Sequence, residues 1–198
     1  MATLPTLRGE HIALRQPRGD DLDDLFALFG NADVTRYWSH GPWTARRQAE
    51  TYLRDIHAGA SSGQLLQWAL TLPAHDRLLG TVTLYGFARD HARCEIGFAL
   101  HPGHWGQGLA RDAVHTAIAH ALGSLAIQRI EADVDPANHS SLRLLESLGF
   151  VREGLARERY RLGGGTQDSV MLGLLSREYI AERPIAPRLA EQTSPFSR

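Results

Sequence analysis

Three glycines separate an apolar strand from an apolar helix in the stretch 101–110, which reads HPGHWGQGLA. Apolar and β-branched residues before it predict a strand over 93–101, and apolar residues at helical spacing from Ala110 onward predict a helix. Glycines at such a turn let backbone N–H groups converge beside the positive end of a helix, which suits a pyrophosphate. A tight strand-to-helix connection would need the same glycines, so both interpretations stay open here. Either way, the chain combines strands and helices in one fold.

The hydrophobic pattern along the rest of the chain predicts one mixed α/β domain. Residues 31–43 look irregular, and we find no internal repeat and no linker that would divide the chain. The expected order is β-α-α-β-β-β-α-β-α-β-β. The strands are expected at 11–15, 64–72, 77–87, 93–101, 127–135, 151–162 and 167–174, and the helices after Asp21, after Thr44, from Ala110 and over 138–148.

The composition excludes several classes of protein. All 21 basic residues are arginine, so a Walker A phosphate loop and a Schiff-base lysine are both ruled out. A net charge of −1 gives no basic field for nucleic acid, and the single cysteine, Cys94, excludes an internal disulfide. His101 and His104 share a loop with no third ligand at metal spacing, so we expect no metal site. We see neither a signal peptide nor an apolar run long enough to span a membrane, and we expect a cytoplasmic protein.

Further motifs follow the glycine loop. The dinucleotide fingerprint GxGxxG is absent, which disfavours a nucleotide-binding module. Instead, NHSS at 138–141 opens the next helix and LESLGF at 145–150 closes it. With EIGFAL at 95–100, WGQGLA at 105–110 and the last two strands, this arrangement resembles the GNAT superfamily of acetyl-CoA-dependent N-acetyltransferases. It most resembles the RimJ/RimL-like branch, which acetylates protein N-terminal amines. Trp105 stands where the general motif has Gln or Arg, but the loop works through backbone N–H groups.

The resemblance covers about 7–182, and it implies a single GNAT domain over 1–182 with a flexible tail over 183–198. The implied fold is α/β, with a central, twisted, mostly antiparallel sheet of about seven strands and about four flanking helices. The sheet is expected to splay at the acetyl-CoA site, and Gly97 is compatible with a bulge in the central strand.

The resemblance also implies acetyl-CoA as co-substrate. Its pantetheine would insert like a missing strand against backbone groups of Phe98 and Leu100, and an N–H near Ala99 or Leu100 would donate to the oxyanion. Asn138 would cap its helix and bond the pantetheine amide. The residues expected to bind acetyl-CoA are Phe98, Leu100, Trp105, Gly106, Gln107, Gly108, Leu109, Ala110, Asn138 and Ser141.

Two residues are the expected catalytic groups. Glu95 lies in the strand that leads into the glycine loop, and apolar neighbours would raise the pKa of its carboxyl group toward that of a general base. A salt-bridged structural carboxylate is the alternative. Ser141 would protonate the departing thiolate, although a first-turn serine commonly satisfies its own helix. Tyr160 is a second candidate for this acid, with strand packing as its alternative role.

The acceptor is expected to be a protein N-terminal amine, with a small amine such as a polyamine, amino acid or aminoglycoside as the alternative. Tyr37, Trp38 and Trp43 lie in the segment that walls the acceptor site in this family. Hydrophobic packing of the two helices on either side of this segment is the alternative explanation for them. A rival hypothesis is an acyl-CoA-binding protein without catalysis, and the joint presence of Glu95, Asn138 and Ser141 argues against it. Whether the chain forms a homodimer stays open.

Overall fold

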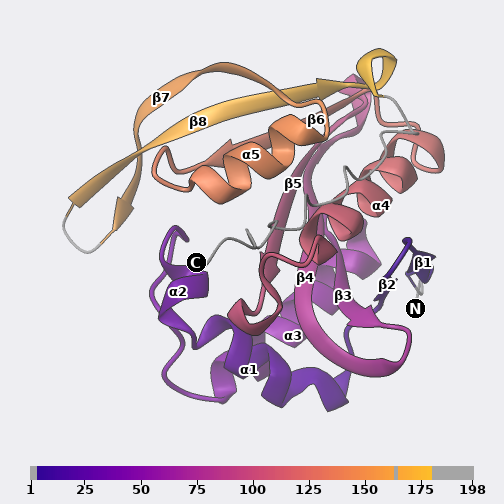
Figure 1. Ribbon diagram of the computed structural model, residues 1–198, viewed down its shortest axis with the longest axis vertical. Helices are drawn as coiled ribbons and strands as arrows, with labels where there is room; N and C mark the ends of the chain where they lie inside the picture. Colours follow the sequence, from indigo (N-terminus) through magenta and orange to yellow (C-terminus); the bar gives the residue numbers. More distant parts are fainter. Residues whose placement is uncertain (1–3, 163–164, 180–198) are drawn as a thin grey trace, which may run out of the picture.

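Eight strands form one sheet in the computed structural model, which describes residues 4–162 and 165–179. The strand order is β1-β2-β3-β4-β5-β6-β8-β7, and every neighbouring pair is antiparallel except β5 and β6. The long β7–β8 hairpin extends away from the rest of the molecule (Figure 1). The strands are β1 (Leu7–Arg8), β2 (Ala13–Arg15), β3 (Leu66–Leu72), β4 (His75–Ala88), β5 (Arg93–Leu100), β6 (Arg129–Val134), β7 (Val151–Leu162) and β8 (Gly165–Leu175).

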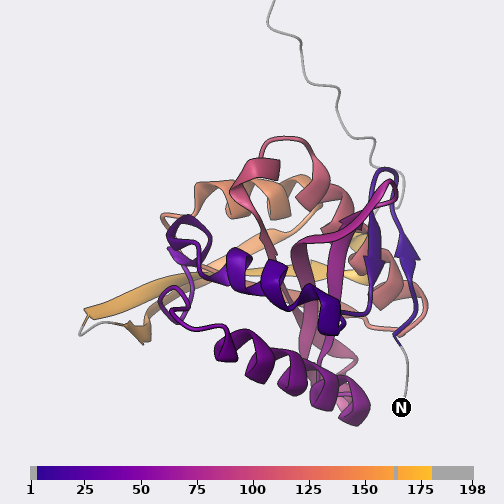
Figure 2. The ribbon, with the colours of Figure 1, turned by 90° about the horizontal axis from the view of Figure 1, so that it is seen from below.

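Helices cover both faces of this sheet. Helices α1 and α3 lie side by side on one face, as Figure 2 shows, and pack on β4 and β3. Helices α4 and α5 pack on the other face in the larger apolar core, which includes Ala113, Ile118 and Leu145. The helices are α1 (Leu22–Phe29), α2 (Ala32–Thr35), α3 (Arg47–Ser62), α4 (Leu109–Gly123) and α5 (His139–Ser147).

The sheet opens between its two parallel strands. Strands β5 and β6 pair only at their beginnings, through the three pairs that end with Glu95 opposite Glu131. Strand β5 then runs on to Leu100 and β6 to Val134 without pairing with each other. The expected splay is therefore present, and it leaves one edge of each strand unpaired in the middle of the sheet. We call this opening the β5–β6 split.

A bulge lies on the strand next to the split, although not at the expected residue. The register between β4 and β5 is continuous through Gly97, which stands opposite Thr83, so the bulge suggested at Gly97 was wrong. The register shifts instead between Tyr85 and Ala88. Gly86 lies within that shift with φ of +60°, a conformation that glycine adopts without steric cost.

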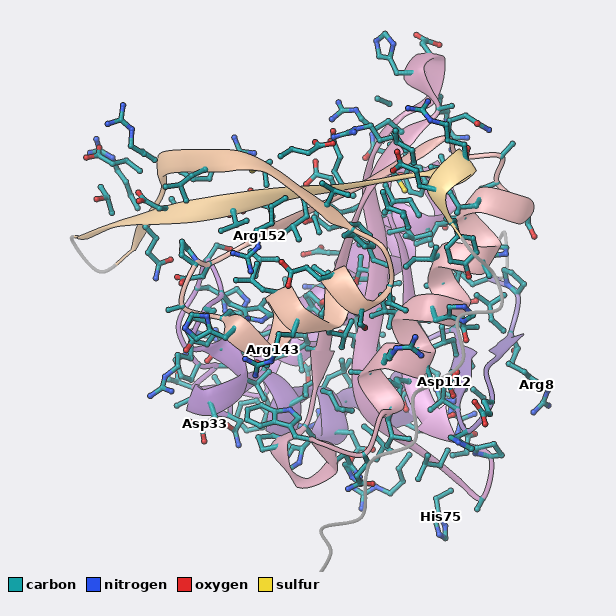
Figure 3. The ribbon with its side chains drawn as sticks, turned by 45° about the horizontal axis from the view of Figure 1, so that its top comes forward. Arg8, Asp33, His75, Asp112, Arg143 and Arg152 are labelled. Atoms are coloured by element: carbon teal, nitrogen blue, oxygen red, sulfur yellow. The ribbon has the colours of Figure 1, made fainter. Side chains whose placement is uncertain are left out.

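The N-terminal β1–β2 hairpin is fixed to α4 by one buried carboxylate. Asp112 accepts hydrogen bonds from the backbone N–H groups of Glu10 at 3.0 Å and His11 at 2.7 Å. Its side of α4 faces the hairpin, as Figure 3 shows. Gly9 is required beside it, because a Cβ atom there would lie 2.3 Å from Asp112 Oδ1.

The structure confirms the expected order of elements and the α/β fold, with small additions. The two-residue strand β1 and the four-residue helix α2 were not predicted, because both are too short to show a period. The second long helix begins at Arg47 rather than directly after Thr44, and the Gln48 side chain reaches back to accept hydrogen bonds from the N–H groups of Thr44 at 2.8 Å and Ala45 at 3.0 Å. The expected flexible tail over 183–198 lies outside the described residues, and the single domain over 1–182 stays a prediction.

Candidate active site

A cleft of about 420 Å³ lies at the β5–β6 split. It reaches from the segment around α2, past the sheet, to the N-terminus of α5 and the β7–β8 hairpin. Aromatic and polar side chains line it together, which is typical of a site that binds an organic ligand and holds it in one orientation. The lining residues used below are Tyr37, Trp38, Tyr52, Gln67, Thr83, Tyr85, Gly97, Phe98, Asp133, Asp135, Asn138, Ser141, Tyr160 and Asp168.

The β5 edge presents backbone groups to the split. The N–H of His101 donates to Leu79 O at 2.8 Å, which makes these residues a hydrogen-bonded pair across β4 and β5. Because such pairs alternate along antiparallel strands, the polar backbone groups of Ala99 face β4, whereas those of Phe98 and Leu100 face the split. This is the orientation expected for Phe98 and Leu100, and it favours Leu100 over Ala99 as a donor toward the split. The Leu100 carbonyl already accepts the Trp105 indole N–H at 2.6 Å.

The glycine loop and α4 follow directly from β5. Gly106 and Gly108 have φ of +74° and +82°. Helix α4 begins at Leu109, and a backbone hydrogen bond from the Asp112 N–H to the Gly108 carbonyl closes its first turn. The N–H groups of Leu109 and Ala110 lie N-terminal to the Asp112 N–H in this turn, so they point out of the N-terminal end of the helix. Both side chains pack on the apolar core, so these two residues offer a ligand their backbone rather than their side chains.

The side chains of Trp105 and Gln107 each make a hydrogen bond that holds a different part of this loop. The Trp105 ring is half exposed, and its indole bond to Leu100 ties the loop to the end of β5. The Gln107 side chain reaches back to Gly103 O at 3.3 Å. None of the residues 105–110 lines the cleft itself, so their expected contact with a pyrophosphate stays a prediction.

The N-terminus of α5 lies on the opposite side of the split. Asn138 caps this helix as expected: its Oδ1 atom accepts from the Ser141 N–H at 3.2 Å and from the Ser140 hydroxyl at 3.0 Å. Asn138 and Ser141 both line the cleft. The helix end brings partial positive charge to a place where negative charge would be stabilised.

Glu95 lies beside the cleft but does not line it. Tyr85 stands opposite it on β4, does line the cleft, and has its hydroxyl group near enough to the Glu95 carboxylate to lower the pKa of that carboxyl group. Burial raises the pKa of Glu95, Glu131 and Asp133 raise it further, and the Tyr85 hydroxyl opposes the shift. Burial also raises the pKa of Tyr85, which therefore stays protonated as a donor.

Gly86 makes room for that carboxylate. A Cβ atom at Gly86 would lie 2.7 Å from Glu95 Oε1, so a larger residue at this position would displace the Glu95 carboxylate. Sequence reasoning missed Tyr85 and Gly86, because the cross-strand register that pairs them with Glu95 cannot be read from either strand alone.

Asp133, also missed from the sequence, organises the wall on the β6 side. Its nearly buried carboxylate accepts the Tyr160 hydroxyl at 2.9 Å and the Arg159 Nε–H at 3.1 Å, and the Ser169 hydroxyl bonds its other oxygen. Burial is the largest cause that raises the pKa of Tyr160. The Tyr160 hydroxyl, the alternative acid, is thus already engaged with a carboxylate.

The three aromatic residues expected at the acceptor site divide into two groups. Tyr37 and Trp38 line the cleft, and the Trp38 ring also packs edge-on against Phe29 at 5.0 Å between centroids. Trp43 is not among the lining residues; its ring packs against Phe29 at 4.8 Å and against Tyr52 at 5.3 Å. Packing of the helices accounts for Trp43, whereas Tyr37 and Trp38 remain candidates for acceptor contact.

Other chemistries find less support in the residues described. Burial raises the pKa of the Cys94 thiol to about 12, so Cys94 is a poor nucleophile. Within residues 4–162 and 165–179 no three His, Cys, Asp or Glu side chains gather in a way that could hold a metal ion. In the same part of the chain, no helix combines the length and the apolar character of a membrane span.

Solved structures of other proteins share this fold. RimJ of Mycobacterium smegmatis, in complex with CoA-disulfide, superposes with a TM-score of 0.79 at 21% identity, over 89% of this chain and 88% of its own. A spermidine N-acetyltransferase from Vibrio cholerae, in complex with CoA and spermine, has a TM-score of 0.76 at 24% identity, over 85% of this chain and 98% of its own.

Sequence comparison gives the family. The N-acetyltransferase p20 of Bacillus licheniformis is 35% identical over 176 residues, which are 89% of this chain and 99% of that protein. The sequence profile described as the acetyltransferase (GNAT) domain matches residues 11–151. These residues include the glycine loop, the β5–β6 split and the α5 cap. The chain therefore belongs to the GNAT family of acetyltransferases.

Proposed function

We propose that this enzyme transfers the acetyl group of acetyl-CoA to the N-terminal amine of a protein. Family membership makes it an acetyl-CoA-dependent N-acetyltransferase, as the sequence analysis predicted. The observation that carries the assignment of the site is the β5–β6 split, where an unpaired strand edge, a helix N-terminus and a cleft meet.

The split and the glycine loop that follows it fit two polar parts of acetyl-CoA, the pantetheine arm and the pyrophosphate. The outward-facing backbone groups of Phe98 and Leu100 would pair with the pantetheine amides, and Asn138 would meet the same arm from the opposite side. The pyrophosphate would sit on the N–H groups between Gly106 and Ala110, where the α4 dipole favours negative charge. The sequence has no lysine, so any side-chain cation at this place must be an arginine or a protonated histidine.

Proton removal would run through Tyr85 to Glu95. The acceptor ammonium gives a proton to the Tyr85 hydroxyl oxygen while the Tyr85 proton passes to the Glu95 carboxylate, leaving a neutral amine and a carboxylic acid. The raised pKa of Glu95 brings it closer to the pKa that suits a base near neutral pH. A water that links the amine to Tyr85 would serve the same route.

The amine nitrogen then attacks the thioester carbonyl carbon. The N–H groups of Phe98 and Leu100 both face the split, and the one that does not pair with pantetheine would donate to the oxygen as negative charge develops there. When the C–S bond breaks, Ser141 would stabilise or protonate the thiolate at the positive end of α5. The tetrahedral adduct collapses to the amide and free CoA. The second amine proton replaces the one that Ser141 gives to the thiolate, or goes to solvent if CoA leaves as the thiolate, and Glu95 returns its proton to solvent.

A small amine is the second candidate acceptor. The carboxylates of Asp133, Asp135 and Asp168 line the cleft and would attract a cation, and one protein of the same fold acts on spermidine. The aromatic side chains Tyr37 and Trp38 would contact either kind of acceptor.

A direct screen tests the proposal. The enzyme is incubated with acetyl-CoA and with peptides that differ in their first residue, polyamines, amino acids or aminoglycosides, and free thiol is measured. We expect thiol release that depends on a peptide with a free N-terminus and disappears when that terminus is already acetylated. Thiol release with small amines alone would contradict the protein acceptor, and binding of acetyl-CoA without release for any amine would indicate a non-catalytic protein.

A further inference from the structure

One buried polar atom at the acceptor end of the cleft has no partner. Gln67, on β3, is 2% exposed and lines the cleft. Its Oε1 atom accepts the Tyr52 hydroxyl at 2.7 Å and the Thr83 hydroxyl at 3.0 Å. Its Nε2 atom has no hydrogen-bond partner among the residues that the structure describes. Buried donors are nearly always satisfied in folded proteins, so an unpaired amide at a ligand cleft points to the ligand.

The position of Gln67 relates it to the reacting groups. Gln67 stands opposite Thr83 on β4, and Thr83 stands opposite Gly97 on β5, so the three form one row across the sheet. The next row on the same face contains Tyr85 and Glu95, because residues two apart along a strand share a face. Gly97 contributes no side chain, which leaves space between the Gln67 amide and the split.

The two hydroxyl bonds orient the amide. The Tyr52 hydroxyl on α3 and the Thr83 hydroxyl on β4 both donate to Oε1, so two separate elements hold the oxygen. With both hydroxyl groups on the oxygen, the Nε2 protons are left to donate elsewhere. The chemical complement of this atom is a carbonyl or carboxylate oxygen.

We propose that Gln67 Nε2 binds a carbonyl oxygen next to the acceptor's amine, so that the acceptor carries an α-amino carbonyl unit. This inference rests on the proposed function and narrows its acceptor: the N-terminal residue of a peptide and an amino acid amide both have this unit. A polyamine has donors and cations but no acceptor oxygen, and would leave Nε2 unpaired.

The carboxylates of the cleft do not give a polyamine a replacement for the hydrogen bond to Gln67 Nε2. Asp133 is paired with Arg159, Asp135 accepts the Ala137 N–H at 2.7 Å, and Asp168 accepts the Glu158 N–H at 2.8 Å. Each of these carboxylates thus already has an internal partner, and their common field acts on the reacting ammonium of any acceptor.

Two variants and matched substrates test the inference. Gln67→Glu keeps an oxygen for the Tyr52 and Thr83 hydroxyl groups and replaces the donor with an acceptor, whereas Gln67→Met removes both functions at similar volume. The substrates are an alanine-initiated peptide, alaninamide, spermidine and 3-methylbutan-2-amine, which has the branched shape of alaninamide without its carbonyl. Melting temperature and CoA binding are measured for each variant as controls of folding and of the cofactor side.

We expect the wild type to prefer the two carbonyl-containing amines. Both variants should lower kcat/KM for these amines about tenfold or more, the usual effect of losing a buried hydrogen bond to a substrate. Activity on 3-methylbutan-2-amine should be unchanged, and Gln67→Glu should not lower activity on spermidine. The relative rates with peptide and alaninamide show which of the two sources of the unit the site takes.

Equal losses for substrates with and without the carbonyl, in folded variants that bind CoA, would overturn the role of Gln67. A wild type that acetylates spermidine in preference to the carbonyl-containing amines would overturn it as well while leaving acetyl transfer intact. If the wild type acetylates no amine although CoA binds, the proposed function itself fails, and the acceptor inference with it.

Discussion

Replacing Glu95 with glutamine isolates the proton route from the rest of the site. The side chain keeps its size, so the close approach to Gly86 is preserved, and its amide oxygen can still lie beside the Tyr85 hydroxyl. Only the ability to take up a proton is lost. Acetyl-CoA affinity should stay unchanged, because the contacts proposed for acetyl-CoA come from other residues, at the end of β5, in the glycine loop and at Asn138.

The expected loss follows from the geometry. General-base catalysis contributes about 10²- to 10⁴-fold, which corresponds to about 3 to 5 kcal/mol of transition-state stabilisation. We expect the lower end, near 10²-fold in kcat, because the Glu95 carboxylate acts through Tyr85 and a solvent molecule can replace part of this route. Tyr85→Phe removes the link between Glu95 and the cleft, and should cost a similar factor.

The pH profile gives the second readout. Burial raises the pKa of Glu95, so the carboxylate becomes protonated, and the base is lost, at a higher pH than for an ordinary glutamate. Activity of the wild type should therefore fall as the pH is lowered through that raised pKa, and this acidic limb should weaken in Glu95→Gln. The assay is thiol release at saturating acetyl-CoA over a range of pH.

The double variant tests whether Tyr85 and Glu95 act together. If they form one route, Glu95→Gln with Tyr85→Phe should be no slower than the slower single variant, because residues that act as a unit are not additive. Multiplied losses would refute the shared route. Unchanged turnover in Glu95→Gln at neutral pH would refute the base itself and make Glu95 a structural carboxylate.

Three further outcomes are expected. Acetyl-CoA at about a hundredfold excess over Kd should stabilise the enzyme by about 2.7 kcal/mol. Gly108→Val should abolish this stabilisation, because the φ of +82° at residue 108 disfavours a β-branched residue, whereas Gly123→Ala should retain it. Calorimetry of both variants with and without acetyl-CoA measures the difference. Ser141→Ala should lower kcat more than Tyr160→Phe, since the Tyr160 hydroxyl is bound to a carboxylate, and the reverse order in steady-state kinetics would exchange their roles. Asp112→Ala should lower the free energy of unfolding by about 1 to 3 kcal/mol because it leaves two N–H groups of the β1–β2 turn unpaired, and an unchanged denaturant midpoint would contradict this.

Local patterns were sufficient to predict most of the elements. The spacing of Leu25 and Phe29 predicts α1, because the helix buries one face and its period appears in the sequence. The apolar and β-branched residues along 93–101 predict β5. Asn138 could be recognised as a helix cap for the same reason: the signal lies within four residues of chain. The resemblance to the family supplied the splay, which no local pattern encodes.

The parts of the site that were missed depend on register between strands distant in sequence. Tyr85 meets Glu95, and Gln67 meets Thr83, only once the alignment of β3, β4 and β5 is fixed. The bulge was expected at Gly97 because a glycine in a strand is a common marker, but the register shift belongs to Gly86. Trp43 and Trp38 look equivalent in sequence, and only tertiary packing separates the one behind the wall from the one that lines the cleft.

The central claim is that acetyl-CoA occupies the β5–β6 split as an additional strand. Residue-resolved amide hydrogen exchange with and without saturating CoA tests it most directly. The N–H groups of Phe98 and Leu100, which face the split, should exchange more slowly when CoA binds, whereas the N–H of Ala99, which faces β4, should be unaffected. CoA binding that leaves the exchange of both Phe98 and Leu100 unchanged would contradict the account.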